Sequence, residues 1–196
     1  ARLAIAGDNP MMLSGQYPVE VGRANLAMSK AYKPAQEKIV TFDINWTIVP
    51  YPGTAWAKQV FQGESDETAT RKLADAIFAA TRIDRPDPVA AWAEHNAKLL
   101  ERQTWLTGRN FRSLKYRGPG TDLEIGLADG HAWKGGASKA RNGITCNPNI
   151  PSEEVFTTPH RLRVDGRVRS TKPLRRNGTV IENIGVRFEG SRVVQA

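Results

Sequence analysis

The sequence predicts an α+β fold in which a helical α/β first half precedes a mostly antiparallel β second half. Apolar runs bounded by turn residues occur at LAIAG and INWTIVPYP, and such runs are typical of buried parallel strands. Helical periodicity then continues to Leu106, whereas period-two alternation dominates after Asn110. We therefore expect an α/β and helical part over residues 1–110 and a β-rich part over 111–196, with the boundary between 108 and 118.

The first half begins with a strand, a helix and a second strand. LAIAG runs into Asp8-Asn9-Pro10 and predicts a short buried strand. Residues 19–33 have loosely helical spacing, and we expect Pro34 to interrupt that helix. INWTIVPYP is rich in β-branched and aromatic residues and ends in Pro-Tyr-Pro-Gly, which predicts a strand over residues 44–52. This order, forming a Rossmann-like layer, is the pattern of an α/β unit.

Residues 54–106 predict three further helices. Asp66 and Asp87 stand where N-caps are expected, and Pro86 and Pro88 separate the second helix from the third. Each helix has an apolar face, composed in turn of Trp56, Val60 and Phe61; Leu73, Ile77 and Phe78; and Val89, Trp92 and Leu99.

The second half predicts antiparallel strands in FRSLKYRG, TDLEIGL, RLRVDGRVRS and TVIENIGVRFEGSRVV. The pairs Asp165-Gly166 and Asn177-Gly178 are hairpin signals. GPGTDLEIG lacks the features of a phosphate-binding loop, and a tight turn into a strand fits it better.

Composition limits the class of protein. The chain contains no apolar run of roughly 18 residues that could span a bilayer. Its single cysteine, Cys146, cannot form an intramolecular disulfide, which favours a reducing compartment and hence the cytoplasm. The net charge of +8 is concentrated in alternating sequence between Arg161 and Arg176. A solvated strand face explains that alternation, so we do not expect a nucleic-acid partner.

The segment NPNIPSEEVFTTPH, residues 147–160, holds the strongest candidate site. Pro148, Pro151 and Pro159 favour an extended, conformationally restricted backbone. Neighbouring side chains of an extended segment point to opposite faces, so Glu153 and Glu154 are expected to act differently. A rigid extended segment is a suitable support for a metal-ligand carboxylate.

Other catalytic chemistries lack their signatures. The histidines His95, His131 and His160 form neither HExxH nor another paired-ligand spacing, and no serine lies in GxSxG. HAWKGG, beginning at His131, is either a loop beside a pocket or an ordinary surface turn.

Six segments that nearly fill the chain are informative together: NWTIVPYP, AWAKQVF, PDPVAAWAEHN, GPGTDLEIGLADGHAW, NPNIPSEEVFTTPH and VDGRVRSTKPL. In these segments and in their order, the chain resembles the aminopeptidase T type of dinuclear metallopeptidases. The resemblance implies a cytoplasmic, dimeric exopeptidase that removes N-terminal residues from peptides. It also implies two divalent metal ions, with zinc, cobalt or magnesium as candidates, that hold a bridging water.

Site residues follow from the resemblance. The motif implies that Glu154 is a metal ligand and Glu153 its structural neighbour, with the reverse assignment as the alternative. His131, Trp133 and His95 are weaker candidates for the substrate cleft, because only their position within matched motifs supports them. The family's remaining ligands, a glutamate, two histidines and an aspartate, would follow Ala196, and an opening α/β segment would precede Ala1. We therefore expect a central piece of a longer enzyme that is inactive alone.

The alternative hypothesis is a noncatalytic binding module. Its basic β face would take a polyanion or a protein partner, and would consist of Arg161, Arg163, Arg167, Arg169, Arg175 and Arg176.

Overall fold

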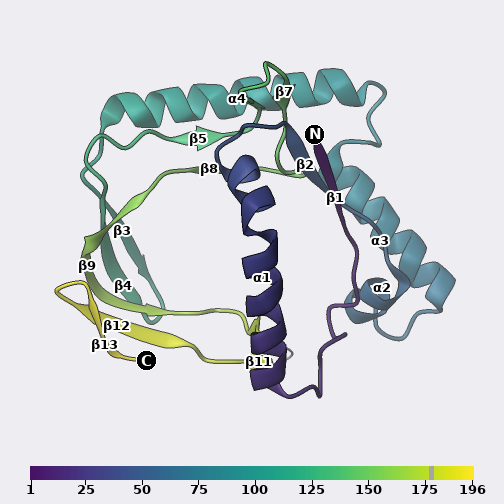
Figure 1. The fold of residues 1–196 in the computed structure, drawn as a ribbon, viewed down its shortest axis with the longest axis horizontal. Helices are drawn as coiled ribbons and strands as arrows, with labels where there is room; N and C mark the ends of the chain where they lie inside the picture. Colours follow the sequence, from purple (N-terminus) through teal and green to yellow (C-terminus); the bar gives the residue numbers. More distant parts are fainter. Residues whose placement is uncertain (177–178) are drawn as a thin grey trace. The chain divides into compact units, whose positions relative to one another are not determined.

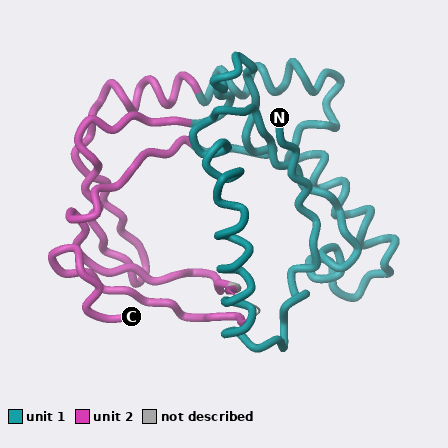
Figure 2. Tube along the Cα trace, in the orientation of Figure 1, with its two compact units in different colours: residues 1–99, 135–154 teal, residues 100–134, 155–196 magenta. Residues whose placement is uncertain are grey.

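The computed structural model describes residues 1–176 and 179–196, without the side chain of Arg175. This part of the chain forms two compact units (Figure 2). Unit 1 consists of residues 1–99 and 135–154, and unit 2 consists of residues 100–134 and 155–196. The domain boundary expected between residues 108 and 118 stays a prediction. Over the described ranges, every helix is too short or too polar to cross a membrane.

Unit 1 contains the predicted strand, helix and second strand (Figure 1). β1 (Arg2–Ala6) and β2 (Trp46–Pro50) pair in parallel, from Arg2 opposite Trp46 to Ala6 opposite Pro50. The connection between them contains α1 (Pro18–Val40). A tight turn reverses the chain and therefore joins antiparallel strands. Parallel strands need a long crossover that returns the chain to the end of the sheet where the first strand began.

A third extended segment joins β2 from a distant part of the sequence. The Ile48 N–H donates to the Pro148 carbonyl at 2.8 Å, and the Ile150 N–H donates to the Ile48 carbonyl at 3.0 Å. Ile48 and Asn149 thus form a parallel bridge. These two bonds place the start of the glutamate motif along β2.

The predicted interruption of α1 at Pro34 is wrong, because the helix continues through this proline to Val40. Proline removes the N–H that would bond to the carbonyl of Lys30, but Lys30 is exposed and water can satisfy that carbonyl. The helix ends instead at Thr41, whose N–H and hydroxyl both donate to the Glu37 carbonyl.

The three predicted helices are present as α2 (Thr54–Val60), α3 (Asp66–Thr81) and α4 (Pro88–Arg109). Asp87 caps α4 as expected, since its Oδ1 accepts from the Ala90 N–H at 2.9 Å. Asp66 is not the N-cap of α3, because Ser65 Oγ accepts the Thr68 N–H at 3.2 Å. Asp66 instead opens the helix, where its charge favours the positive end of the helix dipole.

The core of unit 1 lies between α2 and α3. Ala69, Leu73 and Ile77 repeat every four residues along α3 and pack with Ala57 of α2. The predicted apolar faces hold only in part. Val89 is 81% exposed, because it lies in the first turn of α4, about 80° around the helix from buried Leu99. Val60 and Phe78 are also exposed.

Unit 2 is built on a five-stranded antiparallel sheet with the order β13-β12-β9-β4-β3. Gly118 and Thr121 face each other across the β3–β4 turn, and Gly120 has a φ of 73°, so GPGT is the tight turn that the sequence predicts. The strands are β3 (Ser113–Gly118), β4 (Thr121–Leu127), β9 (Pro159–Arg169), β12 (Gly185–Glu189) and β13 (Arg192–Gln195).

Short strands complete the described chain. β6 pairs with β7, and β10 pairs with β11, in both cases antiparallel. The predicted turn at Asn177-Gly178 lies outside the described residues. The short strands are β5 (Lys134–Gly135), β6 (Ser138–Lys139), β7 (Thr145–Cys146), β8 (Val155–Phe156), β10 (Leu174–Arg176) and β11 (Thr179–Ile181).

The predicted hairpin at Asp165-Gly166 is wrong, because β9 runs straight through both residues. Gly166 has a φ of 113°, and a Cβ there would lie 2.2 Å from the Asp122 carbonyl oxygen. This glycine therefore permits a close approach of β9 to β4 rather than a turn. Asp165 Oδ1 accepts the Gly190 N–H at 2.6 Å, between β12 and β13.

Replacing Gly166 with alanine should destabilise unit 2 by roughly 2–4 kcal/mol, because a Cβ adds both a backbone clash and positive-φ strain. Urea unfolding followed by circular dichroism measures this loss. Gly185→Ala in β12 is the matched control, since a Cβ there meets no atom within 4 Å. Equal stability of the two variants would contradict the steric account.

Candidate functional site

A cavity of about 550 Å³ lies in unit 1 where β1 and β2 end. Ala6 and Pro50, the last residues of these strands, both line it. Ligands of α/β layers commonly bind outside the carboxyl ends of parallel strands, which makes this cavity a candidate site. The full lining is Ala6, Ile48, Pro50, Asn149, Ile150, Pro151, Ser152, Glu153 and Glu154.

The glutamate motif enters this cavity in the non-helical form that its prolines predict. Its start is fixed to β2 by the Ile48 ladder, and residues 151–154 continue without regular secondary structure. The adjacent glutamates Glu153 and Glu154 both line the cavity, but their partners differ.

Glu153 is held by two side chains from the helical region. Its Oε1 accepts a hydrogen bond from Arg82 Nη2 at 2.7 Å, and its Oε2 lies 3.5 Å from His95 Nε2. Arg82 follows the end of α3, and His95 lies on α4. The side chains of Arg82 and His95 are 19% and 10% exposed, so most of this contact is shielded on their side.

His95 also binds the backbone beside Glu153. Its Nε2 lies 2.6 Å from the Ser152 carbonyl oxygen, and its Nδ1 lies 3.1 Å from Arg82 Nη2. A carbonyl oxygen only accepts, and a guanidinium only donates. The proton of His95 is therefore on Nε2, which donates to Ser152, while Nδ1 accepts from Arg82. His95 was a weak sequence candidate, and the structure brings it to the glutamate motif.

Arg82 is the site residue that sequence reasoning missed. It is the C-cap of α3 in the left-handed conformation, with φ 61° and ψ 18°. Its guanidinium carbon lies 5.1 Å from the centre of the Trp92 ring, and Trp92 Nε1 donates to the Thr81 carbonyl at 2.8 Å. No sequence motif marks such a residue, because its role depends on a segment 71 positions away.

Glu154 has a free carboxylate. Within residues 1–176 and 179–196, it takes part in no hydrogen bond or ion pair, and it is exposed on the cavity lining. An unpaired carboxylate is a suitable oxygen ligand for a divalent cation. The described residues contain no group of three or more His, Cys, Asp or Glu that could complete a metal site. Among the described residues, Glu154 is therefore an unpaired oxygen donor on the cavity and not part of a complete metal site.

The other two weak candidates, His131 and Trp133, belong to unit 2. His131 Nδ1 donates to the Ala128 carbonyl at 2.9 Å, and in the described part of the chain its buried Nε2 has no partner. The backbone N–H of Trp133 donates to Thr107 Oγ1 at 3.0 Å. Their assignment to a substrate cleft stays a prediction.

His131, Arg163 and Asp129 all line one cavity of unit 2, and Arg163 and Asp129 form an ion pair there. Arg163 Nη1 and Nη2 bind the two carboxylate oxygens of Asp129 at 2.7 and 2.9 Å, and Nη1 also donates to the Leu127 carbonyl. The hydrogen bonds and charge of Arg163 lower the pKa of Asp129 below its ordinary value, and Asp129 in turn raises the pKa of Arg163.

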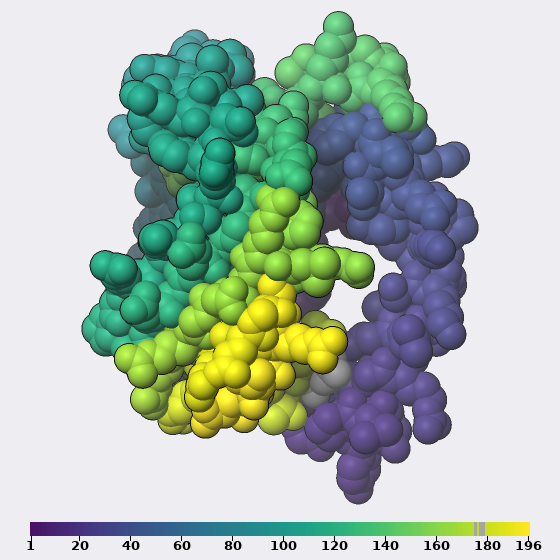
Figure 3. Space-filling model, turned by 90° about the vertical axis from the view of Figure 1, so that its left-hand side faces the viewer, coloured from purple at the N-terminus to yellow at the C-terminus, as the bar shows by residue number. Residues whose placement is uncertain are grey.

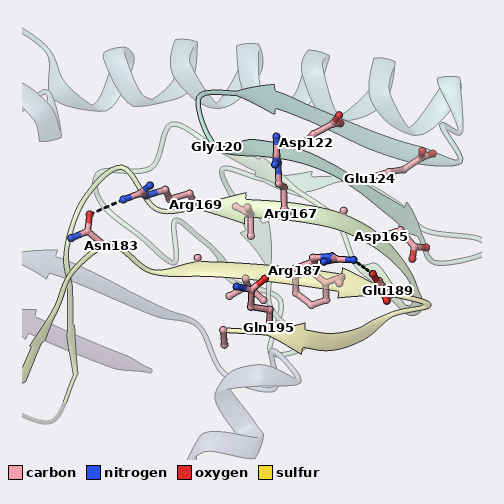
Figure 4. Close-up of a pocket in the computed structure, with 16 residues that line it drawn as sticks. Gly120, Asp122, Glu124, Asp165, Arg167, Arg169, Asn183, Arg187, Glu189 and Gln195 are labelled. Carbon is pink, nitrogen blue, oxygen red and sulfur yellow. Dashed lines mark hydrogen bonds and ion pairs between the residues drawn. The ribbon is translucent and has the colours of Figure 1, made fainter.

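The six arginines of the alternative hypothesis are divided between two sheets. β9 of the five-stranded sheet carries Arg161, Arg163, Arg167 and Arg169, whereas Arg175 and Arg176 belong to β10, which pairs with β11 in a separate sheet. The strands β9, β12 and β13 are neighbours in the sheet of unit 2, and Figure 3 shows the atoms of the C-terminal residues, coloured yellow-green to yellow, gathered together. A cavity of about 1160 Å³ lies over this sheet, with Arg167 and Arg169 among its lining residues. Carboxylates alternate with the arginines, however, and Figure 4 shows Arg187 paired with Glu189. The acidic lining residues are Asp122, Glu124, Asp165 and Glu189.

The fold defines the class of protein. The solved structure of wild-type AmpT from Thermus thermophilus superposes with a TM-score of 0.90 at 49% identity, covering 100% of this chain and 48% of that one. This likeness confirms the predicted α+β class, a helical α/β first half followed by a mostly antiparallel second half.

The match to a protein family extends over the whole sequence. The family described as Thermophilic metalloprotease (M29) matches residues 1–196, and this chain belongs to it. Aminopeptidase T of Thermus thermophilus is 52% identical over 195 residues, and Aminopeptidase 2 of Geobacillus stearothermophilus is 41% identical over 194. The alignments cover 100% and 99% of this chain but 48% and 47% of those proteins. The chain thus spans about half the length of the relatives that it matches.

Asp129→Asn should lower the melting temperature near neutral pH, because it removes the charge that Arg163 binds. A carboxyl whose pKa is lower in the folded than in the unfolded protein stabilises the folded state at pH values above its unfolded pKa. This stabilisation is lost as the pH falls through the pKa of the folded state. The difference from wild type should therefore shrink below the ordinary value of 3.8. Thermal unfolding at neutral pH and at about pH 2 measures it.

Asp122→Asn is the control for this pH dependence, because Asp122 lies 3.8 Å from Arg117 in an exposed pair. It should show a smaller difference at neutral pH. A melting-temperature difference for Asp129→Asn that persists undiminished in acid would contradict the assignment.

Proposed function

We propose that this chain supplies one metal-ligand carboxylate, Glu154, to a metal-dependent aminopeptidase that removes N-terminal residues from peptides. The observation that carries the proposal is the difference between two adjacent glutamates on one cavity. Glu153 is bound by Arg82 and His95, whereas Glu154 has no partner among the described residues. The relatives are named aminopeptidases, and they belong to a metalloprotease family.

The metal requirement follows from the donor chemistry. Carboxylate oxygen suits zinc, cobalt or magnesium, and we propose two such ions in the complete enzyme. When bound, divalent ions supply an activated water and polarise the scissile carbonyl. Glu154 alone cannot hold two ions, and no other metal-binding cluster occurs in the ranges that the structure describes. We therefore propose that the remaining ligands come from outside residues 1–196.

The parent enzyme is, in this proposal, a cytoplasmic homodimer that acts on peptide substrates. Two observations support the location and the partner: Cys146 has no cysteine to pair with in the sequence, and the relatives bear the names of aminopeptidases. The dimer rests on the resemblance of the sequence motifs alone.

The noncatalytic binding module receives less support. A polyanion site needs basic side chains that are free to contact phosphate. Of the arginines of the basic β face, Arg163 is bound to Asp129, and Arg169 donates to Asn183 Oδ1. The interleaved carboxylates would repel a polyanion, so the charge of this face does not favour nucleic acid.

In the full-length enzyme, Glu154→Gln should remove about one metal equivalent and most of the activity. Glutamine keeps the shape of the side chain but is a poor ligand for hard divalent ions. The loss in metal affinity should exceed the roughly 10–100-fold that an outer partner contributes. Metal analysis of dialysed protein and kinetics with aminoacyl p-nitroanilides measure both effects. Glu94→Gln, at the exposed Lys98 pair on α4, is the control. Unchanged metal content in Glu154→Gln would reject the assignment.

The isolated chain of residues 1–196 should bind divalent metal weakly and release no p-nitroaniline from aminoacyl p-nitroanilides. One carboxylate provides too few ligands for a catalytic ion. Steady-state assays with added zinc, cobalt or magnesium measure this. Activity that a chelator abolishes and metal restores would overturn the prediction.

A further inference from the structure

We infer that Arg82 and His95 are positioning residues that orient Glu154 for metal binding by fixing the two residues before it. This inference rests on the proposed role of Glu154 as a ligand. Within the described residues, Arg82 and His95 make no hydrogen bond or ion pair with Glu154. They bind the carbonyl of Ser152 and the carboxylate of Glu153, and these bonds determine the position of the backbone at the next residue, Glu154.

The backbone before Glu154 is anchored at successive points. Pro148 and Ile150 are bonded to Ile48 of β2, and Ser152 is bonded to His95 of α4. Glu153 is bonded to Arg82 at the end of α3. The chain is thus tied first to the sheet and then to two helices of the same unit. A metal ligand must be held to within a few tenths of an ångström, and this series of anchors meets that need.

Arg82 determines the hydrogen-bonding form of His95. Because the guanidinium donates to Nδ1, the ring proton is on Nε2 and is available for the Ser152 carbonyl. One nitrogen of Arg82, Nη2, serves both His95 and Glu153. The two residues therefore act as one unit, and the loss of either should release both the backbone and the side chain.

The exposure of the cluster distinguishes positioning from simple stabilisation. The side chain of Glu153 is 62% exposed, and ion pairs with such exposed partners contribute little to folding. The bond from His95 to Ser152, by contrast, is made by a side chain that is only 10% exposed. The expected consequence of breaking the cluster is thus a misplaced Glu154 more than an unfolded chain.

A pair of histidine substitutions tests the inference in the full-length enzyme. His95→Gln keeps an N–H donor at the reach of Nε2, whereas His95→Asn is shorter and cannot reach Ser152. We expect His95→Asn to weaken zinc binding by about 10–100-fold and His95→Gln to restore most of it. Zinc titration by calorimetry gives the affinity, and urea unfolding of each metal-free variant gives its stability.

Substitutions at Arg82 provide a second test that is independent of those at His95. Arg82→Asn removes the guanidinium, and asparagine tolerates the left-handed backbone that Arg82 adopts. It should weaken zinc binding as His95→Asn does. Arg85→Asn, which removes a nearby exposed arginine paired with Asp84, should leave zinc affinity unchanged.

The outcomes separate the inference from the proposed function. If Glu154→Gln loses zinc while His95→Asn and Arg82→Asn bind it within twofold of wild type, the positioning role is overturned and the ligand role stands. If Glu154→Gln keeps its zinc, the proposed function fails instead. Stability losses in both cluster variants without a change in zinc affinity would show a structural clamp only, and would also overturn the inference.

Discussion

The two backbone hydrogen bonds at Ile48 are the constraint on which the site depends. They join residues separated by about a hundred positions and lay residues 148–150 beside β2 in parallel. This bridge fixes the start of the glutamate motif relative to the carboxyl end of β2. Because parallel pairing fixes both register and direction, it delivers the following residues, 151–154, to the cavity at those strand ends.

Two neighbouring glutamates of one cavity have different surroundings. Glu153 lies against a cationic guanidinium and an imidazole, so its oxygens are already occupied. Glu154, one residue further, keeps its lone pairs available for an incoming cation. The backbone just before the pair is held as well, because the Ser152 carbonyl accepts from His95.

Much of the fold could be predicted from the sequence, because periodicity and turn residues are local signals. The strands of unit 1, its three helices after β2 and the antiparallel sheet of unit 2 all follow from such signals. The errors have local and nonlocal causes. Pro34 costs only one hydrogen bond on an exposed helix, and Gly166 serves a close approach between strands that looks like a turn in sequence. The site was harder to predict. The prolines indicated the extended glutamate motif, but Arg82 reaches it only through the tertiary fold.

At Arg82, a strained left-handed backbone is combined with hydrogen bonds to His95 and Glu153. Glycine is the residue that best suits a helix C-cap of this conformation, and an arginine there carries conformational strain. Selection for heat resistance alone would therefore favour glycine at this position, and would discard the guanidinium that orders the glutamate motif. A screen that ranks substitutions by melting temperature alone would therefore select Arg82→Gly although it removes the hydrogen bonds of the guanidinium.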